Sequence, residues 1–194
     1  MISHKYKFIF IHIPKTAGMS IDKKFTNTRG ICYKTDYEGL WHYTTEEIIE
    51  KFGDGVWDEY TSFTVVRNPW DRMVSEYSWQ RQQNWGNRDI SFFDFCKCNY
   101  DWYPEKEKLH LKTQFSFCID SAKTFRIGNL VKFENLQEGL NIVCDKIGIP
   151  HQKLRHINKS KHKHYTEYYD DENRQIVAEK FAKDIEYFGY KFGE

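Results

Sequence analysis

The sequence predicts an α/β fold with a mainly parallel sheet, and three observations support this class. Short apolar runs rich in β-branched and aromatic residues occur at 8–11, 60–66 and 129–133. Such runs are typical of strands that are buried on both faces of a sheet. A helical pattern with its own start signal follows each run. Strands that alternate with helices along a chain form parallel sheets flanked by helices.

Length and composition limit the number of domains, the kinds of partner and the cellular environment that we expect. The 194 residues suffice for one well-buried α/β domain and are too few for two, so we expect a single domain over 1–194. A formal net charge of +1 provides no global field that would attract nucleic acid or an anionic membrane. Five scattered cysteines fit a reduced, cytoplasmic protein better than a disulfide framework, and they form no recognisable zinc site. The N-terminal apolar stretch is too short for a signal peptide or a membrane anchor, so we expect no stable membrane insertion.

The first strand, 8–11, leads into the segment KTAGMS at 15–20, and a helix can continue from Ser20. A strand, a tight turn of small residues and a helix N-terminus together favour anion binding, because free backbone N–H groups and the helix dipole both attract negative charge. Lys15 adds a cation, and the hydroxyls of Thr16 and Ser20 add donors. We therefore expect a phosphate site here. The alternative is an ordinary turn in which Lys15 is merely solvated.

The order of residues separates this loop from a Walker A motif. That motif has several residues between its first glycine and its lysine, whereas Lys15 precedes Gly18 here. A P-loop nucleotide kinase would also need an acidic magnesium ligand after a strand, and Arg67 stands at that position. A kinase nevertheless remains an alternative, as does a non-catalytic nucleotide-binding module that needs no base.

A candidate base follows the first helix. We expect a second short strand at 30–33 and a helix after Thr44, because Thr44 and Glu47 have the spacing of a capping box. His42 lies in the loop just before this helix. Loops on a rigid scaffold commonly carry function, and a histidine suits proton transfer near neutral pH. Equally, His42 could be packed between its two aromatic neighbours in the sequence.

A second anion site is expected where the next strand ends. The strand 60–66 stops at Arg67, and an Asn-Pro pair then starts a helix that we expect to run to about residue 83. Arg67 at the strand end and Ser75 in the helix come near each other, at the carboxyl edge where open α/β sheets bind ligands. The structural alternative is an ion pair from Arg67 to a carboxylate such as Asp71 or Glu76.

The remaining half of the chain is less regular. The aromatic-rich segment 79–126 has poor periodicity, and we interpret it as an acceptor-binding insertion that contains a short helix capped by Ser91. Most of its rings are expected to be core. After the strand 129–133, Asn135 and Glu138 have capping-box spacing and predict another helix.

The C-terminal part holds a basic loop at 151–164 that includes Lys159 and Ser160. Such a run is usually a solvated surface, but it can also fold over a multiply charged ligand. One last helix is expected to start at Asp170 and to end just before Gly189.

Two segments resemble the carbohydrate sulfotransferases, of the heparan sulfate 2-O type. FIHIPKTAGMS resembles their 5′-phosphosulfate loop, and VVRNPWDRMVSEY resembles their 3′-phosphate motif. KFENL and the C-terminal segment HINKSKHKHYTEYYDDENRQIVAEKFAKDIEYFGYKF look like the short soluble bacterial-type sulfotransferases of the same superfamily. The resemblance departs at Met19, where the family more often has a small or hydroxyl residue, and over 79–126.

This resemblance implies a P-loop-like three-layer fold, and it implies 3′-phosphoadenosine-5′-phosphosulfate as the sulfuryl donor, with no metal. The implied donor-binding residues are Lys15, Thr16, Ala17, Gly18, Met19, Ser20, Arg67, Ser75, Lys159 and Ser160. The reaction would be an in-line transfer to a hydroxyl-bearing acceptor, expected to be a glycan.

The implied catalytic residues are Lys15 and His42. Lys15 would neutralise the leaving oxygen, and His42 would act as the general base. Glu46, Glu47 and His12 are the other candidate bases, although His12 is expected to be structural.

Overall fold

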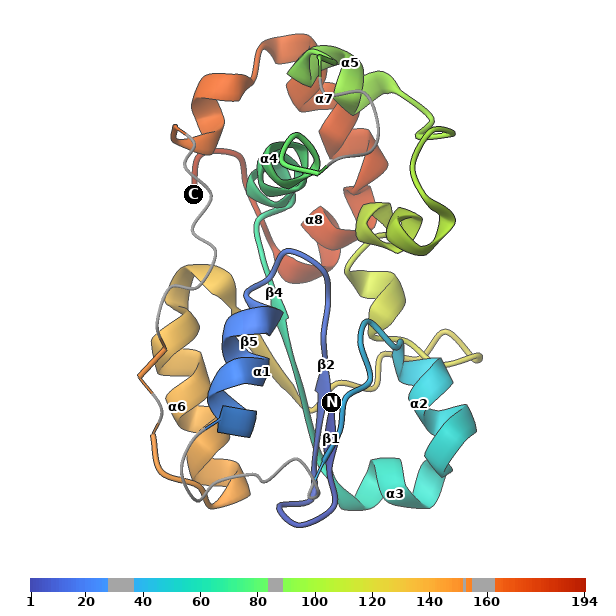
Figure 1. The fold of residues 1–194 in the computed structure, drawn as a ribbon, viewed down its shortest axis with the longest axis vertical. Helices are drawn as coiled ribbons and strands as arrows, with labels where there is room; N and C mark the ends of the chain where they lie inside the picture. The colour runs from blue at the N-terminus through green and yellow to red at the C-terminus, as the bar shows by residue number, and fades with distance from the viewer. Residues whose placement is uncertain (28–36, 84–88, 152, 155–162) are drawn as a thin grey trace. The chain divides into compact units, whose positions relative to one another are not determined.

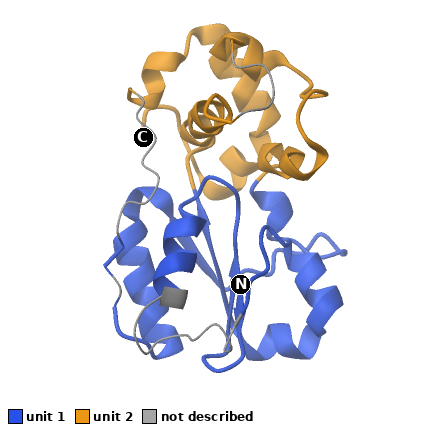
Figure 2. Cartoon of the chain, viewed as in Figure 1, with its two compact units in different colours: residues 1–66, 114–157 blue, residues 67–113, 158–194 orange. Residues whose placement is uncertain are grey.

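The computed structural model describes residues 1–27, 37–83, 89–151, 153–154 and 163–194. The chain forms two compact units (Figure 2). Unit 1 comprises residues 1–66 and 114–157, and unit 2 comprises residues 67–113 and 158–194. The strand expected at 30–33 and the site residues Lys159 and Ser160 lie outside the described residues.

Unit 1 is built on a five-stranded sheet with the strand order β3-β1-β2-β4-β5 (Figure 1). The strands are β1 (Ile2–Ser3), β2 (Phe8–Ile11), β3 (Tyr37–Glu38), β4 (Thr61–Val66) and β5 (Asn129–Lys132). β4 pairs in parallel with both β2 and β5, which confirms the three strands expected from the apolar runs. β1 pairs antiparallel with both β2 and β3, so this side of the sheet is antiparallel and the sheet is mixed.

Helices flank the sheet of unit 1 on both sides, which confirms the α/β class (Figure 1). α1 (Gly18–Asn27) and α6 (Leu136–Ile147) lie on one side. α2 (Thr45–Phe52) and α3 (Asp54–Glu59) lie on the other. The loop between β2 and α1 therefore joins the sheet to one helical layer.

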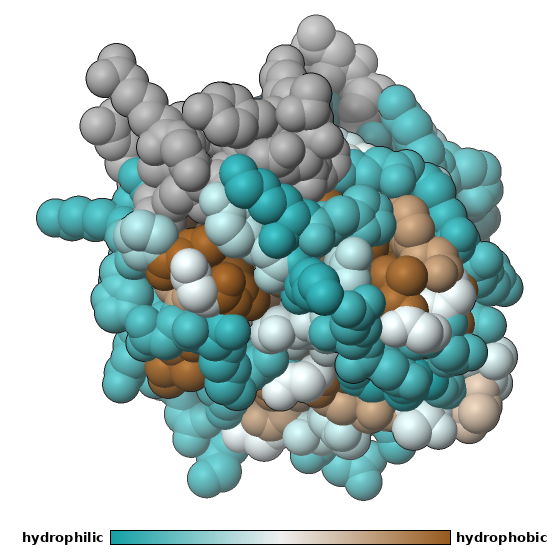
Figure 3. Space-filling model, turned by 90° about the horizontal axis from the view of Figure 1, so that it is seen from below, coloured by the Kyte–Doolittle hydropathy of each residue, from teal (hydrophilic) through white to brown (hydrophobic). Residues whose placement is uncertain are grey.

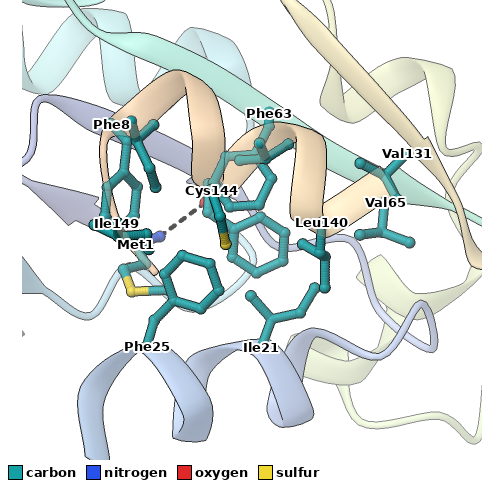
Figure 4. Packing of buried hydrophobic residues seen from close by; sticks show 13 residues of the cluster. Met1, Phe8, Ile21, Phe25, Phe63, Val65, Val131, Leu140, Cys144 and Ile149 are labelled. Atoms are coloured by element: carbon teal, nitrogen blue, oxygen red, sulfur yellow. Dashed lines mark hydrogen bonds between the residues drawn. The ribbon is translucent and has the colours of Figure 1, made fainter. Parts of the chain in front are cut away.

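The core of unit 1 lies between the sheet and the layer of α1 and α6 (Figure 4). Phe25 of α1 packs against the strand residues Phe8 and Phe63, with ring centroids 5.7 and 6.2 Å away. Leu140 and Cys144 of α6 are buried in the same cluster. This apolar packing holds α1, and with it the preceding loop, against the sheet.

Local start signals correctly predicted helices α2, α4 (Pro69–Gln80), α5 (Phe92–Lys97) and α6, although the capping bond expected for α6 is not formed. The capping box of α2 is confirmed, since the Glu47 N–H donates to Thr44 Oγ1 and Glu47 Oε2 accepts from the Thr44 N–H at 2.7 Å. The Asn68 side chain caps α4 by accepting from Trp70 N–H at 3.1 Å, although this helix ends earlier than expected.

The capping box expected at Asn135 and Glu138 is wrong. A short 3₁₀ helix, η3 (Phe133–Asn135), leads directly into α6. Asn135 therefore has φ −120° and ψ 36°, and its side chain makes no capping bond to the described backbone of α6. A capping side chain needs the extended backbone conformation that this 3₁₀ entry excludes.

Unit 2 is helical. Besides α4 it contains α5 (Phe92–Lys97), η1 (Glu105–Leu111), η4 (Tyr165–Tyr168), α7 (Asp171–Lys180) and α8 (Ala182–Phe188), whereas η2 (Phe115–Phe117) belongs to unit 1. Ser91 caps α5 as expected.

The expectation of one continuous last helix is wrong, because the chain leaves helical geometry at Phe181, with φ −115° and ψ 27°. The Phe181 ring is buried, and the guanidinium of Arg72 lies 5.1 Å from the ring centroid. This packing outweighs the continuity of the helix.

The aromatic segment 79–126 is divided between the units at residue 114. Many of its rings are core, as expected: Phe92, Phe95, Tyr100 and Tyr103 are buried in the main cluster of unit 2. The role of the segment as an acceptor-binding insertion stays a prediction.

The surface seen from below is mostly hydrophilic, and its hydrophobic residues form separate patches (Figure 3). Scattered apolar surface of this kind is ordinary and points to no partner. None of the helices in the described ranges has the length and apolar character needed to cross a bilayer.

Candidate functional site

The candidate phosphate loop runs from β2 into α1 and has an unusual backbone. Lys15 and Ala17 have positive φ angles of 67° and 71°, a region that residues other than glycine enter only at a cost. Thr16 lies between them, fully buried, and its Oγ1 donates to the carbonyl oxygen of Ile13 at 2.8 Å. The Thr16 hydroxyl proton therefore holds the turn together.

α1 begins at Gly18, earlier than the expected start at Ser20. The N–H groups of Ser20 and Ile21 both donate to the Ala17 carbonyl, at 2.9 and 3.2 Å. The first turn, Gly-Met-Ser-Ile, contains no acidic residue. The positive end of the helix dipole is therefore not neutralised by a carboxylate of its own first turn, which favours an external anion.

The glycine of the loop is required by a close approach to His12. A Cβ atom on Gly18 would lie 1.9 Å from both Cδ2 and Nε2 of the His12 ring. His12 is itself buried and stacks on Phe10, with ring centroids 5.7 Å apart and an interplanar angle of 15°. The ring of His12 thus packs behind the start of α1, in agreement with the structural role expected for it.

His42 lies beside this loop. Its Nδ1 is 2.9 Å from the carbonyl oxygen of His12, and the two imidazole centroids are 4.4 Å apart. Because a carbonyl oxygen only accepts, Nδ1 must carry the hydrogen, so the neutral ring has its lone pair on Nε2. His42 also has a positive φ of 60°.

The packed alternative for His42 stays open. The ring is half-buried and contacts Trp41 at a centroid distance of 6.2 Å, but Trp41 and Tyr43 are themselves 50% and 37% exposed. The imidazole is also held by the backbone of His12.

The two glutamates that are alternative candidates for the base, Glu46 and Glu47, both form hydrogen bonds that stabilise the fold. Glu47 closes the capping box with Thr44. Glu46 accepts a hydrogen bond from the N–H of Ser121, which ties α2 to the loop after η2. These bonds favour His42 over either glutamate for proton transfer.

Unit 2 contains Arg67 and Ser75, the residues expected to form the second anion site, and the ion pair that the sequence left open as the alternative is formed there. Arg67 Nε donates to Asp71 Oδ2 at 2.7 Å, with both side chains largely buried. Asp71 and Ser75 are four residues apart on α4 and share a face of the helix. Arg67 precedes α4, and its guanidinium is oriented by Asp71, which lies one turn before Ser75.

A second arginine of the same motif is structural. Arg72 is 2% exposed, and its Nη1 and Nη2 donate to the carbonyls of His110 and Lys112 at 3.0 and 2.6 Å. Burial lowers the pKa of Arg72, whereas the charges of Asp184 and Glu76 raise it. Arg72 therefore anchors the segment 110–112 to α4, whereas Arg67 pairs with Asp71.

The sequence did not reveal a buried polar network next to Arg72. Glu76 accepts from Tyr103 Oη at 2.7 Å and lies 3.0 Å from His110 Nδ1. Burial first, and then the charge of Glu76, raise the pKa of Tyr103. These residues are far apart in the chain, and no local spacing links them.

The structure thus groups the predicted residues in two sets. In unit 1 the loop before α1 and His42 both contact His12, and in unit 2 Arg67 pairs with Asp71, four residues before Ser75. Among the residues that the structure describes, no group of three or more His, Cys, Asp or Glu is placed to hold a metal ion.

Comparison with known proteins identifies the family. The family model described as "Sulfotransferase family" matches residues 1–191, which span both units. The chain therefore belongs to the sulfotransferase family and is a transferase, which confirms the superfamily resemblance seen in the motifs. An uncharacterized protein of Archaeoglobus fulgidus is 28% identical over 122 residues, covering 61% of this chain and 92% of that protein. No solved structure matches.

The Gly18→Ala substitution is expected to destabilise the protein. Helix propensity alone would favour alanine by about 1 kcal/mol, but the added methyl group would overlap the His12 ring, and overpacking typically costs about 1–3 kcal/mol. Urea unfolding should show a lower midpoint for Gly18→Ala and little change for the neighbouring control Met19→Ala. An unchanged midpoint for Gly18→Ala would mean that the His12 ring moves aside freely.

Proposed function

We propose that this protein transfers a sulfuryl group from 3′-phosphoadenosine-5′-phosphosulfate to a hydroxyl of an acceptor, expected to be a carbohydrate. The observation that carries the proposal is the position of His42 next to the loop that precedes α1. An anion site and a histidine with its lone pair on Nε2 together provide the two functions that sulfuryl transfer needs. Because one family model spans both units, we also infer that they act as one sulfotransferase domain.

The loop would hold the 5′-phosphosulfate. Its proposed binding residues are Lys15, Thr16, Ala17, Gly18, Met19 and Ser20. Because the N–H groups of Ser20 and Ile21 donate to the Ala17 carbonyl, the N–H groups of Gly18 and Met19 would donate to the phosphate, as is common at helix N-termini. The Thr16 hydroxyl would contribute mainly by holding the turn, since its proton bonds to Ile13.

Proton transfer and leaving-group stabilisation would be divided between His42 and Lys15. As the acceptor oxygen bonds to sulfur, the bond from sulfur to the bridging oxygen breaks, and His42 Nε2 takes the hydroxyl proton. Negative charge develops on the bridging oxygen, which the ammonium group of Lys15 would neutralise. The products are the sulfated acceptor and 3′-phosphoadenosine-5′-phosphate.

The 3′-phosphate would bind to Arg67 and Ser75. A guanidinium has five N–H donors and favours bidentate contact with phosphate. The bond from Arg67 Nε to Asp71 fixes the plane of that guanidinium. Lys159 and Ser160, which lie outside the described residues, are proposed to add to the same donor site.

Replacement of Arg67 should weaken binding of 3′-phosphorylated ligands selectively. Charge-assisted hydrogen bonds are worth about 1.5–3 kcal/mol, so calorimetry on Arg67→Ala should show a loss of roughly tenfold to a hundredfold for 3′-phosphoadenosine-5′-phosphate. Binding of AMP should change little. The contrasting variant Arg72→Ala should instead lower the unfolding midpoint, because it leaves two carbonyl partners unpaired. Equal losses for both nucleotides in Arg67→Ala would show that Arg67 serves only as the partner of Asp71.

Removal of the Lys15 charge should depress turnover more than donor affinity. Lys15→Met keeps much of the side-chain length, and loss of one transition-state donor typically lowers kcat by about 10²–10³. Steady-state kinetics with varied donor would measure both constants, and Lys23→Met, on the exposed side of α1, is the matched control. A raised donor KM with intact kcat would assign Lys15 to ground-state binding alone.

Replacement of His42 should remove general-base catalysis without unfolding the protein. Asparagine tolerates the positive φ at this position, so His42→Asn should lose about 10²–10⁴ in turnover while donor binding and the unfolding midpoint stay close to wild type. The neutral imidazole is the active form, so the wild-type rate should fall on acidification as the ring takes up a proton. The variant should lose that limb of the pH profile. A folded His42→Asn protein that retains most of its turnover would place the base elsewhere.

A further inference from the structure

Trp41 combines exposure with contact to the candidate base. Half of its surface is exposed, whereas two other tryptophans, Trp57 and Trp70, are at least 95% buried. Its indole centroid lies 5.4 Å from that of His12 and 6.2 Å from that of His42. The indole is therefore held next to both imidazoles while much of its surface remains open to solvent.

A single exposed aromatic residue is ordinary on a protein surface, so the contact with the histidines is the decisive feature. Rotation of the Trp41 side chain is limited by the two imidazole rings that it contacts. A preformed aromatic surface binds a ligand ring at low cost in side-chain entropy.

The hollow next to Trp41 is too small to enclose a ligand ring. It measures about 10 Å³ and is lined in part by Phe10, His12, Leu40 and Trp41. A space of this size holds about one water molecule. A ring-shaped ligand that contacts Trp41 would therefore lie on its exposed surface and not in this hollow.

We propose that Trp41 selects an acceptor whose hydroxyl is carried on a saccharide ring. The inference rests on the proposed function, since it uses His42 as the base. A pyranose presents an apolar C–H face that fits an indole, while its hydroxyl groups project from the rim. With its ring on Trp41, the acceptor has a rim hydroxyl beside the His42 imidazole. Trp41 is thus a specificity-determining residue for the acceptor.

Tyr43 provides a matched control. It is also exposed and also adjacent to His42 in the sequence. Its ring, however, faces the ammonium group of Lys51 on α2, at 5.8 Å from the centroid. The two aromatic neighbours of His42 therefore differ in whether they contact the histidine pair.

The test uses the full chain and a panel of methyl hexopyranosides, the corresponding open-chain alditols and simple phenols, with sulfur-labelled donor. Wild-type protein should sulfate pyranosides in preference to alditols and phenols. Trp41→Ala should raise the acceptor KM roughly tenfold, in line with the loss of one aromatic contact, while kcat changes little. Trp41→Phe should recover most of the affinity, and Tyr43→Ala should behave as wild type.

Three outcomes would overturn the inference. They are an unchanged acceptor KM in Trp41→Ala, a preference for alditols or phenols, and no transfer to any member of the panel. Calorimetric titration of the same proteins with 3′-phosphoadenosine-5′-phosphate separates the two proposals. If the donor product still binds after one of these outcomes, the donor site of the proposed function stands. Only the role of Trp41 in acceptor selection is then overturned.

Discussion

The close approach of the His12 ring to Gly18 is the constraint on which the candidate site depends. A Cβ at position 18 would lie 1.9 Å from the imidazole, so a residue larger than glycine requires the His12 ring or the loop to shift. The same histidine accepts the Nδ1 hydrogen bond of His42 through its backbone carbonyl. His12 therefore sets the start of α1 with its side chain and the tautomer of His42 with its main chain. The residue that follows β2 thus contacts both the start of α1 and the candidate base.

Backbone strain is concentrated around this contact. Lys15, Ala17 and His42 all have positive φ angles, and this conformation costs residues with a Cβ about 1–2 kcal/mol each. The loop is held in place by the Thr16 bond to Ile13 and by two helix N–H groups on the Ala17 carbonyl. Strain that is maintained by surrounding bonds is characteristic of functional sites, which agrees with the role proposed for this loop.

In unit 2 the two arginines of one motif, Arg67 and Arg72, form different kinds of contact. Arg67 precedes α4 and is oriented by Asp71, whereas Arg72 is fully committed to the carbonyls of the segment 110–112. Glu76, one turn further along, is satisfied by Tyr103 and His110. Buried charge is tolerated here because each group has hydrogen-bond partners. This network supports α4 and does not involve Arg67 or Ser75, the residues proposed to bind the 3′-phosphate.

Local sequence patterns by themselves determined the three parallel strands, the loop before α1 and the caps of α2, α4 and α5, because each depends on residues within a few positions of one another. The family was also readable from two short motifs. Only the tertiary structure decided the antiparallel side of the sheet, the helix break at Phe181 and the 3₁₀ entry to α6 that leaves Asn135 without a capping bond. It alone also revealed the overlap that a Cβ at Gly18 would cause and the carbonyl that fixes the His42 tautomer. The physical reason is that packing and hydrogen bonding between residues distant in the chain can outweigh local propensity, and no local spacing encodes them.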